Sequence, residues 1–132
     1  MPRWASELPT PVELEILNVL WEQGPSTVRQ VWEVTVQRRQ SAVHSVQTML
    51  DIMVRKRLAG KSRSERVYVY GAKESRELVG RRMVTDLVNR VAEKSVPQLL
   101  KWALDGRMML PEEIGAMRWL VDEAERRGEG RG

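Results

Sequence analysis

The segment 41–57 divides into two unlike faces when its residues are placed at the period of an α-helix. One face is apolar and consists of Val43, Val46, Met49, Leu50, Met53 and Val54. The other carries mostly short hydrogen-bonding side chains, namely Ser41, His44, Ser45, Gln47, Thr48 and Asp51, and ends at Arg55. Solvated helix faces usually carry long charged side chains, whereas these short groups suit close approach to the edges of bases. The pattern predicts a helix, capped by Ser41, with one face on a core and a polar face toward a partner.

Two helices are predicted ahead of this segment. The first covers about 10–23, because Thr10 and Glu13 match a capping box and Gly24 follows the last apolar residues. The second covers about 27–37 and begins beside a serine–threonine pair, either of which can cap it. Both have apolar side chains at helical spacing, so we expect both to pack on the same core as the segment 41–57.

A β-hairpin is predicted next, with strands at 58–61 and 66–70 and a four-residue polar tip at 62–65. Positive charge is concentrated here in a chain of formal net charge +4, since Arg55, Lys56, Arg57, Lys61, Arg63 and Arg66 stand against the single acid Glu65. Three helices followed by a basic hairpin are typical of a winged helix-turn-helix. In that arrangement the third helix enters the major groove and the hairpin, or wing, lies along the phosphate backbone.

From residue 74 onward no strand pattern appears, and three further helices are predicted over about 74–94, 95–105 and 111–127. Their apolar stripes belong to a segment too short to close its own core, so we expect pairing with the same region of a second copy. The residues expected at this dimer interface are Leu87, Val91, Leu99, Leu100, Trp102, Leu104, Ile114, Met117, Leu120 and Val121. The predicted fold class is mainly α with a small β-hairpin. It comprises a winged-helix DNA-binding domain at 1–73, a three-helix dimerisation domain at 74–127 and a disordered tail at 128–132.

The composition argues against several classes of site. The chain has no cysteine and a single histidine, His44, so thiolate metal sites, disulfides and cysteine nucleophiles are excluded and no cofactor is expected. No nucleophile–base pair can be assembled from the spacing, and the acids lie on exposed helix faces, so an enzyme is not predicted. The N-terminus lacks the apolar core of a signal peptide, and no run approaches the roughly 20 apolar residues of a membrane span. We therefore expect a cytoplasmic protein without direct membrane insertion.

Double-stranded DNA is the partner that these features favour. The residues expected to read bases are Ser41, His44, Ser45, Gln47 and Thr48, and those expected to hold phosphates are Arg29, Arg55, Arg63 and Arg66. The alternative is a protein-interaction module that uses a winged helix to bind another protein and never contacts DNA. The basic wing argues against this alternative, because phosphate contacts are the ordinary use of such charge.

The first 70 residues also resemble a known family. The runs Thr10-Pro-Val-Glu-Leu-Glu-Ile-Leu-Asn-Val-Leu-Trp21, Thr27-Val-Arg-Gln-Val31, Ala42-Val-His-Ser-Val-Gln-Thr-Met-Leu50 and Tyr68-Val-Tyr70 occur in its order. Together they resemble the penicillinase repressor family (BlaI/MecI), and Asn89-Arg90-Val91 and Leu99-Leu100 extend the resemblance into the C-terminal region. The resemblance implies a homodimeric repressor on a palindromic operator. It also implies release from DNA when a membrane-bound zinc metalloprotease sensor triggers cleavage in the dimerisation region.

The chain departs from the family pattern at several places. Without cysteine it cannot use the copper-thiolate switch of copper-responsive relatives. Trp102-Ala103 stands where members that respond to β-lactams are cut between Asn and Phe. His44-Ser45-Val46 replaces the favoured Thr-Thr-Val, which implies a different operator preference. Lys56-Arg57 replaces the usual Lys-Gly turn, which adds charge but loses the conformationally permissive glycine.

Overall fold

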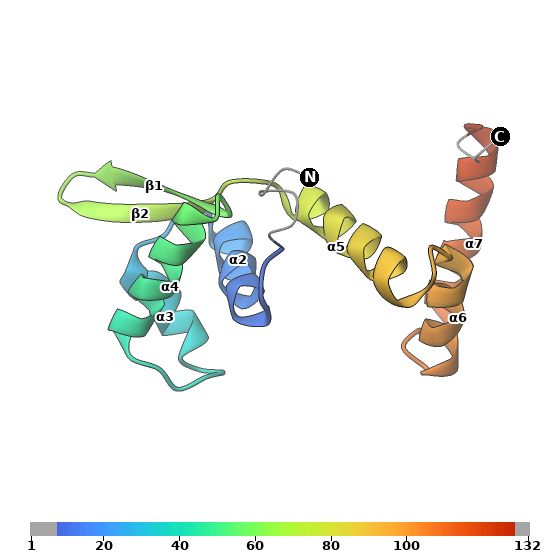
Figure 1. The fold of residues 1–132 in the computed structure, drawn as a ribbon, viewed down its shortest axis with the longest axis horizontal. Helices are drawn as coiled ribbons and strands as arrows, with labels where there is room; N and C mark the ends of the chain where they lie inside the picture. The colour runs from blue at the N-terminus through green and yellow to red at the C-terminus, as the bar shows by residue number, and fades with distance from the viewer. Residues whose placement is uncertain (1–7, 129–132) are drawn as a thin grey trace. The chain divides into compact units, whose positions relative to one another are not determined.

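The computed structural model describes residues 8–128, which form six helices and two strands (Figure 1). In chain order these are α2 (Pro11–Gln23), α3 (Val28–Thr35), α4 (Val43–Arg55), β1 (Ala59–Ser64), β2 (Val67–Ala72), α5 (Arg76–Val91), α6 (Val96–Asp105) and α7 (Pro111–Arg126). This confirms the predicted fold class. The chain divides into two compact units, Met1–Thr85 and Asp86–Gly132, with the division inside α5. The domain boundaries at 73 and 127 stay predictions, and residues 129–132 of the predicted tail lie outside the described residues.

Local capping explains where the first two helices begin. The Glu13 N–H donates to the Thr10 hydroxyl at 3.2 Å and the Thr10 N–H donates to the Glu13 carboxylate at 2.9 Å, so the predicted capping box is present at α2. An equivalent box begins α3, where Thr27 rather than Ser26 is the cap. α2 ends at Gly24, whose φ of 81° is a conformation that glycine adopts without strain.

α4 begins two residues later than predicted. Its N-cap is Ala42, which provides no side-chain hydrogen bond, so the prediction that Ser41 caps this helix is wrong. The physical reason is tertiary, because the Trp32 indole N–H donates to the Ser41 carbonyl oxygen at 2.7 Å and fixes the loop ahead of the helix. At its other end, Arg57 takes a φ of 66°, and the Leu58 N–H reaches back to the Met53 carbonyl at 2.9 Å. Arg57 therefore occupies the left-handed position that favours glycine.

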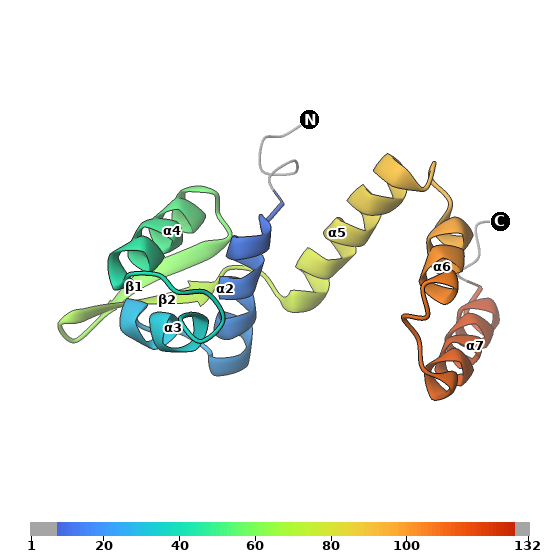
Figure 2. The ribbon, with the colours of Figure 1, turned by 90° about the horizontal axis from the view of Figure 1, so that it is seen from below.

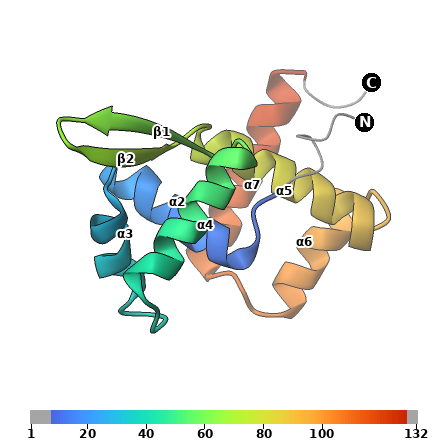
Figure 3. The same cartoon turned by 60° about the vertical axis from the view of Figure 1, so that its left-hand side comes forward.

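The hairpin has a tighter turn than predicted. β1 and β2 are antiparallel and pair Ser64 with Val67, so the turn consists of Glu65 and Arg66 and not of the four residues 62–65. Glu65 adopts a φ of 58°, the positive value that two-residue hairpin turns require. Each strand is longer as a result, and the hairpin extends beyond the helices beside it (Figure 3).

The core of the first unit lies where α2, α3 and α4 pack beside the hairpin (Figure 2). Its most buried side chains are no more than 1% exposed and are Leu17, Val31, Leu50, Met53 and Tyr70. Tyr70 also joins β2 to the loop after α2, because its backbone exchanges two hydrogen bonds with Ser26 at 2.8 and 2.9 Å. The hairpin base is thus part of the core.

The second unit, by contrast, has little core in the residues described. Val88 and Ala92, at 7% and 2% exposure, are its buried apolar side chains, and neither α6 nor α7 contains a buried residue. Most of its large apolar side chains are exposed: Leu87, Val91, Val96, Trp102, Leu104, Met108, Leu110, Trp119, Leu120 and Val121. None of the helices in residues 8–128 has the length and apolar character that crossing a membrane requires.

Candidate nucleic-acid interface

α4 has a buried face and an exposed polar face, as its pattern predicts. The predicted base-reading residues that belong to the helix are exposed, and they are His44, Ser45, Gln47 and Thr48. Ser41 precedes the helix and is half-buried. Val46, Leu50 and Met53 are at most 5% exposed on the opposite face. Turning α4 about its axis would expose these three, so the core fixes which side chains face outward.

The predicted phosphate-binding arginines are exposed and come from different elements: Arg29 from α3, Arg55 from the end of α4, Arg63 from β1 and Arg66 from the hairpin turn. Within residues 8–128 no carboxylate pairs with any of them. Arg29 and Arg63 each hold the guanidinium carbon 5.6 Å from an aromatic ring centroid, that of Trp32 and of Tyr68 respectively. A guanidinium stacked on a ring keeps its N–H groups available for a phosphate.

One face of the hairpin alternates cations with tyrosines across its two strands. The register pairs Lys61 with Tyr70 and Arg63 with Tyr68. The Lys61 ammonium lies 4.4 Å from the Tyr68 ring centroid and 5.4 Å from that of Tyr70, which are cation–π distances. The aromatic rings therefore hold the wing's positive charges in place.

Asp51 connects this face of the hairpin to α4. Its Oδ1 atom accepts a hydrogen bond from the Tyr70 hydroxyl at 2.8 Å and lies 3.4 Å from the Lys61 ammonium. Burial raises the pKa of the Tyr70 hydroxyl, and the hydrogen bond to Asp51 raises it further. The pKa of Lys61 is also raised, first by its contact with Tyr70 and less by the Asp51 carboxylate. At neutral pH the tyrosine is therefore a donor and the lysine is charged.

An ion pair with a buried carboxylate ties α4 to the start of α2. Glu13 is 2% exposed, and its Oε1 atom accepts from the Lys56 ammonium at 2.7 Å. Because Lys56 directly follows α4 and Glu13 lies in the first turn of α2, this pair fixes the C-terminal end of α4. The same carboxylate oxygen caps α2, so one buried group serves two purposes.

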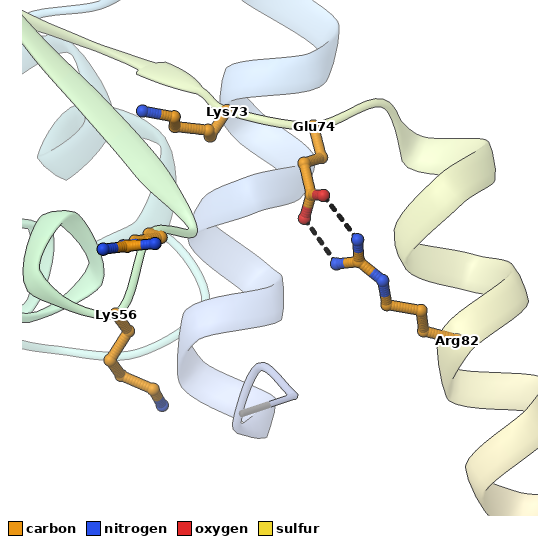
Figure 4. A pocket seen from close by; sticks show the side chains of 5 residues that line it. Lys56, Lys73, Glu74 and Arg82 are labelled. Carbon is orange, nitrogen blue, oxygen red and sulfur yellow. Dashed lines mark hydrogen bonds and ion pairs between the residues drawn. The ribbon is translucent and has the colours of Figure 1, made fainter. Parts of the chain in front are cut away.

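A basic pocket of about 420 Å³ lies beside this end of α4 (Figure 4). It is lined by Lys56, Arg57, Lys73, Glu74 and Arg82. The Arg82 guanidinium binds the Glu74 carboxylate through two hydrogen bonds of 2.5 and 2.6 Å, and the Trp21 indole donates to the Glu74 carbonyl at 2.9 Å. Arg57 and Lys73 have no ion pair within residues 8–128. Their charges are thus available to an anionic group such as a phosphate.

Sequence reasoning missed the three residues that join the wing to α4. Asp51 belongs to the polar face of its helix, Lys61 to the basic cluster and Tyr70 to the alternating strand, and no local signal links them. The hairpin register supplies the link, because Lys61 lies opposite Tyr70 only when the turn is centred on Glu65 and Arg66. Among residues 8–128, no three histidine, cysteine or acidic side chains are grouped so that they could hold a metal ion.

The chain matches a known protein family over most of its length. The family model described as penicillinase repressor matches residues 9–123. Among solved structures the chain is similar to a point variant of ZitR from Lactococcus lactis, with 18% sequence identity, a TM-score of 0.42 and coverage of 92% of this chain and 79% of that chain. A comparison with curated proteins found no match. The chain belongs to the penicillinase repressor family and is a winged-helix, DNA-binding transcriptional repressor.

Proposed function

We propose that two copies of this chain bind a palindromic operator, each with α4 in the major groove and its hairpin along the phosphate backbone, and that the bound dimer blocks a promoter. The exposed polar face of α4 is the single observation that carries the proposal. Four of its side chains, those of His44, Ser45, Gln47 and Thr48, are exposed and free of acidic groups, and a core on the opposite face holds them outward. Such a surface suits hydrogen bonds to base edges.

Base reading is assigned to the residues predicted for it. Gln47 can form a bidentate pair with adenine, whereas His44, Ser45 and Thr48 offer single donors or acceptors. We expect Ser41 to contribute less to base reading, because it is half-buried and its carbonyl oxygen already accepts a hydrogen bond from the Trp32 indole. His44 and Ser45 replace the residues that the family favours, so we expect the operator preference to differ at the bases that these two side chains contact.

Phosphate binding is assigned to Arg29, Arg55, Arg63 and Arg66. All four are exposed and lack an ion pair in the described chain, which supports the assignment. Arg57 and Lys73 of the basic pocket are further candidates for the same role, since both are exposed and unpaired within residues 8–128. Each contact of this kind fixes register and adds affinity without selecting a sequence.

A second copy of the chain is proposed to cover the apolar side chains of the second unit. Six of the ten predicted interface residues are exposed by 42–56%: Leu87, Val91, Trp102, Leu104, Leu120 and Val121. The other four are half-buried, and they are Leu99, Leu100, Ile114 and Met117. Leaving this many large apolar side chains in water is costly, and isologous pairing of identical helices is the commonest way to bury them.

We also propose that proteolysis releases the chain from DNA and that a membrane-bound metalloprotease is the sensor. Membership of the family supports this part of the proposal. The bond between Trp102 and Ala103 lies inside α6. Proteases cut extended chains, so α6 would have to unfold locally before cleavage. The absence of any buried side chain in α6 supports easy local unfolding of this helix in a free monomer.

The proposal is tested by mobility shift of the full chain on the DNA upstream of its own gene, at moderate salt. Gln47→Ala should lose discrimination at one base pair, which costs about 1 to 3 kcal/mol. Arg63→Gln should weaken binding to every sequence alike and reduce the salt slope by about 0.9. A wild-type chain with no sequence preference would contradict the proposal. Full function after neutralisation of Arg63 and Arg66 would favour a protein-interaction module instead.

A further inference from the structure

Asp51 lies in an unexpected place for an acid on a DNA-binding helix. It follows Gln47 and Thr48 by four and three residues, so it shares their face of α4. Its side chain keeps 36% exposure. A carboxylate beside the groove repels phosphates and favours cytosine if it reads a base directly. The contacts it makes within the chain point to a different role.

The Asp51 carboxylate engages the wing through both strands. Lys61 belongs to β1 and Tyr70 to β2, and both reach the same oxygen, at 3.4 and 2.8 Å. Tyr70 is 1% exposed and packs in the core, so its hydroxyl is a fixed donor rather than a mobile one. A two-stranded hairpin is only marginally rigid by itself, which makes its attachment to α4 important for its position.

The contacts continue from Asp51 toward the tip of the wing. The Lys61 ammonium lies over the Tyr68 ring at 4.4 Å, and the Arg63 guanidinium lies over the same ring at 5.6 Å. Tyr68 is 48% exposed, so the rest of the core does not hold it in place. A chain of polar and cation–π contacts therefore runs from the middle of α4 to the arginine that we assign to a phosphate.

We propose that Asp51 is a positioning residue that couples the wing to the recognition helix: through Tyr70 and Lys61 it sets where Arg63 lies relative to the base-reading face of α4. This inference rests on the proposed function. It makes the phosphate contacts of the wing depend on a helix residue that itself binds no DNA. Pairing with Lys61 also neutralises the carboxylate where it would otherwise repel the backbone.

Tyr70→Phe is the most informative variant, because it removes the hydroxyl without changing any charge. It is compared with wild type on a duplex that the wild-type full chain has selected from random sequence, and on a scrambled duplex of equal length. We expect affinity for the selected duplex to fall by roughly threefold to tenfold and the salt slope to fall by about 1 to 2, as for one or two lost phosphate contacts. Hydroxyl-radical footprints should lose protection at the outer, wing-contacted positions and keep it in the centre.

Asp51→Asn should act in the same direction, and Glu33→Gln is its matched control. Glu33 is an exposed acid on α3 with no ion pair within residues 8–128. Removing its charge should strengthen binding and steepen the salt slope, because one source of repulsion is lost. Asp51→Asn should do the reverse, with a shallower slope and a weakened outer footprint. Circular dichroism confirms that each variant is folded at the assay temperature.

Three outcomes overturn the coupling. If both variants lower only the melting temperature and leave slope and footprint unchanged, the contacts are merely structural. If Asp51→Asn steepens the slope as Glu33→Gln does, the carboxylate acts by repulsion alone. If Asp51→Asn changes preference at one base pair with no change of slope, Asp51 reads a base. Failure of the wild-type chain to select any duplex would instead refute the proposed function, which keeps the two failures distinct.

Discussion

The two units of this chain differ in how they bury apolar side chains. In Met1–Thr85, three helices and the hairpin base enclose a core in which Leu17, Leu50 and Tyr70 are nearly inaccessible. In Asp86–Gly132, the described residues bury only two apolar side chains, and α6 and α7 leave large ones exposed. The difference supports the proposal that the first unit is stable by itself, whereas the second is stabilised by association with a second copy. A DNA-reading surface needs the first property, and a dimerising one needs the second.

The largest expected effect comes from opening the core of the first unit. Leu50 is fully buried in α4, so Leu50→Ala leaves a cavity beneath the base-reading face. We expect a loss of about 3 to 4 kcal/mol in the free energy of unfolding of the winged helix. Denaturant unfolding followed by Trp fluorescence measures it. A loss below 1 kcal/mol would contradict the account of the core.

The next largest effect is expected on self-association through the second unit. Leu120 is 56% exposed on α7, and Leu120→Asp would place a charge in the proposed dimer interface. We expect self-association to weaken about 100-fold, because an unpaired carboxylate would be desolvated there. Sedimentation velocity measures the change. Arg118→Asp is the control, since two residues along a helix place the same carboxylate on nearly the opposite face. If both variants weaken self-association equally, the proposed interface does not lie on the Leu120 face of α7.

A smaller effect is expected at the ion pair between α2 and α4. Glu13→Gln removes the charge that binds Lys56 but retains a side chain that can cap α2, as Gln30 does for α3. We expect a loss of about 1 to 2 kcal/mol in unfolding free energy, because Lys56 is partly exposed and its charge can be rehydrated. Thermal unfolding tests this prediction. An unchanged melting temperature would show that the ion pair does not stabilise the first unit.

The smallest expected effect is a gain in stability rather than a loss. Arg57 adopts a φ of 66°, so Arg57→Gly relieves backbone strain at the end of α4. We expect unfolding free energy to rise by about 0.5 kcal/mol, after the greater freedom of glycine in the unfolded chain is subtracted. Arg57→Ala, which keeps the strain, serves as the control in the same denaturant assay. If glycine destabilises more than alanine, the strain is compensated elsewhere.

The parts of the fold that were predictable depend on neighbouring residues. The capping box at Thr10, a cap at Ser26 or Thr27 and the two faces of α4 follow from local spacing, and the structure confirms them, with Thr27 as the cap. The start of α4 was mispredicted because Trp32, nine residues before Ser41, binds its carbonyl. The hairpin turn was mispredicted because Glu65 takes a positive φ, whereas tight hairpin turns usually have glycine, asparagine or aspartate at such a position.

The same limit applies to the candidate site. Which side chains of α4 face outward was predictable, because the apolar face determines the polar one. The role of Asp51 was not, since a four-residue tip would have placed Lys61 opposite Arg66 instead of Tyr70. The alternation of side chains cannot reveal this register shift of four residues, because an even shift leaves every side chain on the same face of the hairpin. The assignments of individual residues to bases and phosphates stay predictions.

Selection of duplexes from random DNA by the full-length chain, followed by the stoichiometry of the selected complex in sedimentation equilibrium, tests the central claim most directly. The account predicts an inverted repeat whose half-sites lie about 10 base pairs, or a multiple of that, from centre to centre. It also predicts two chains on each duplex. Enrichment of no sequence, or a single half-site bound by one chain, would contradict it.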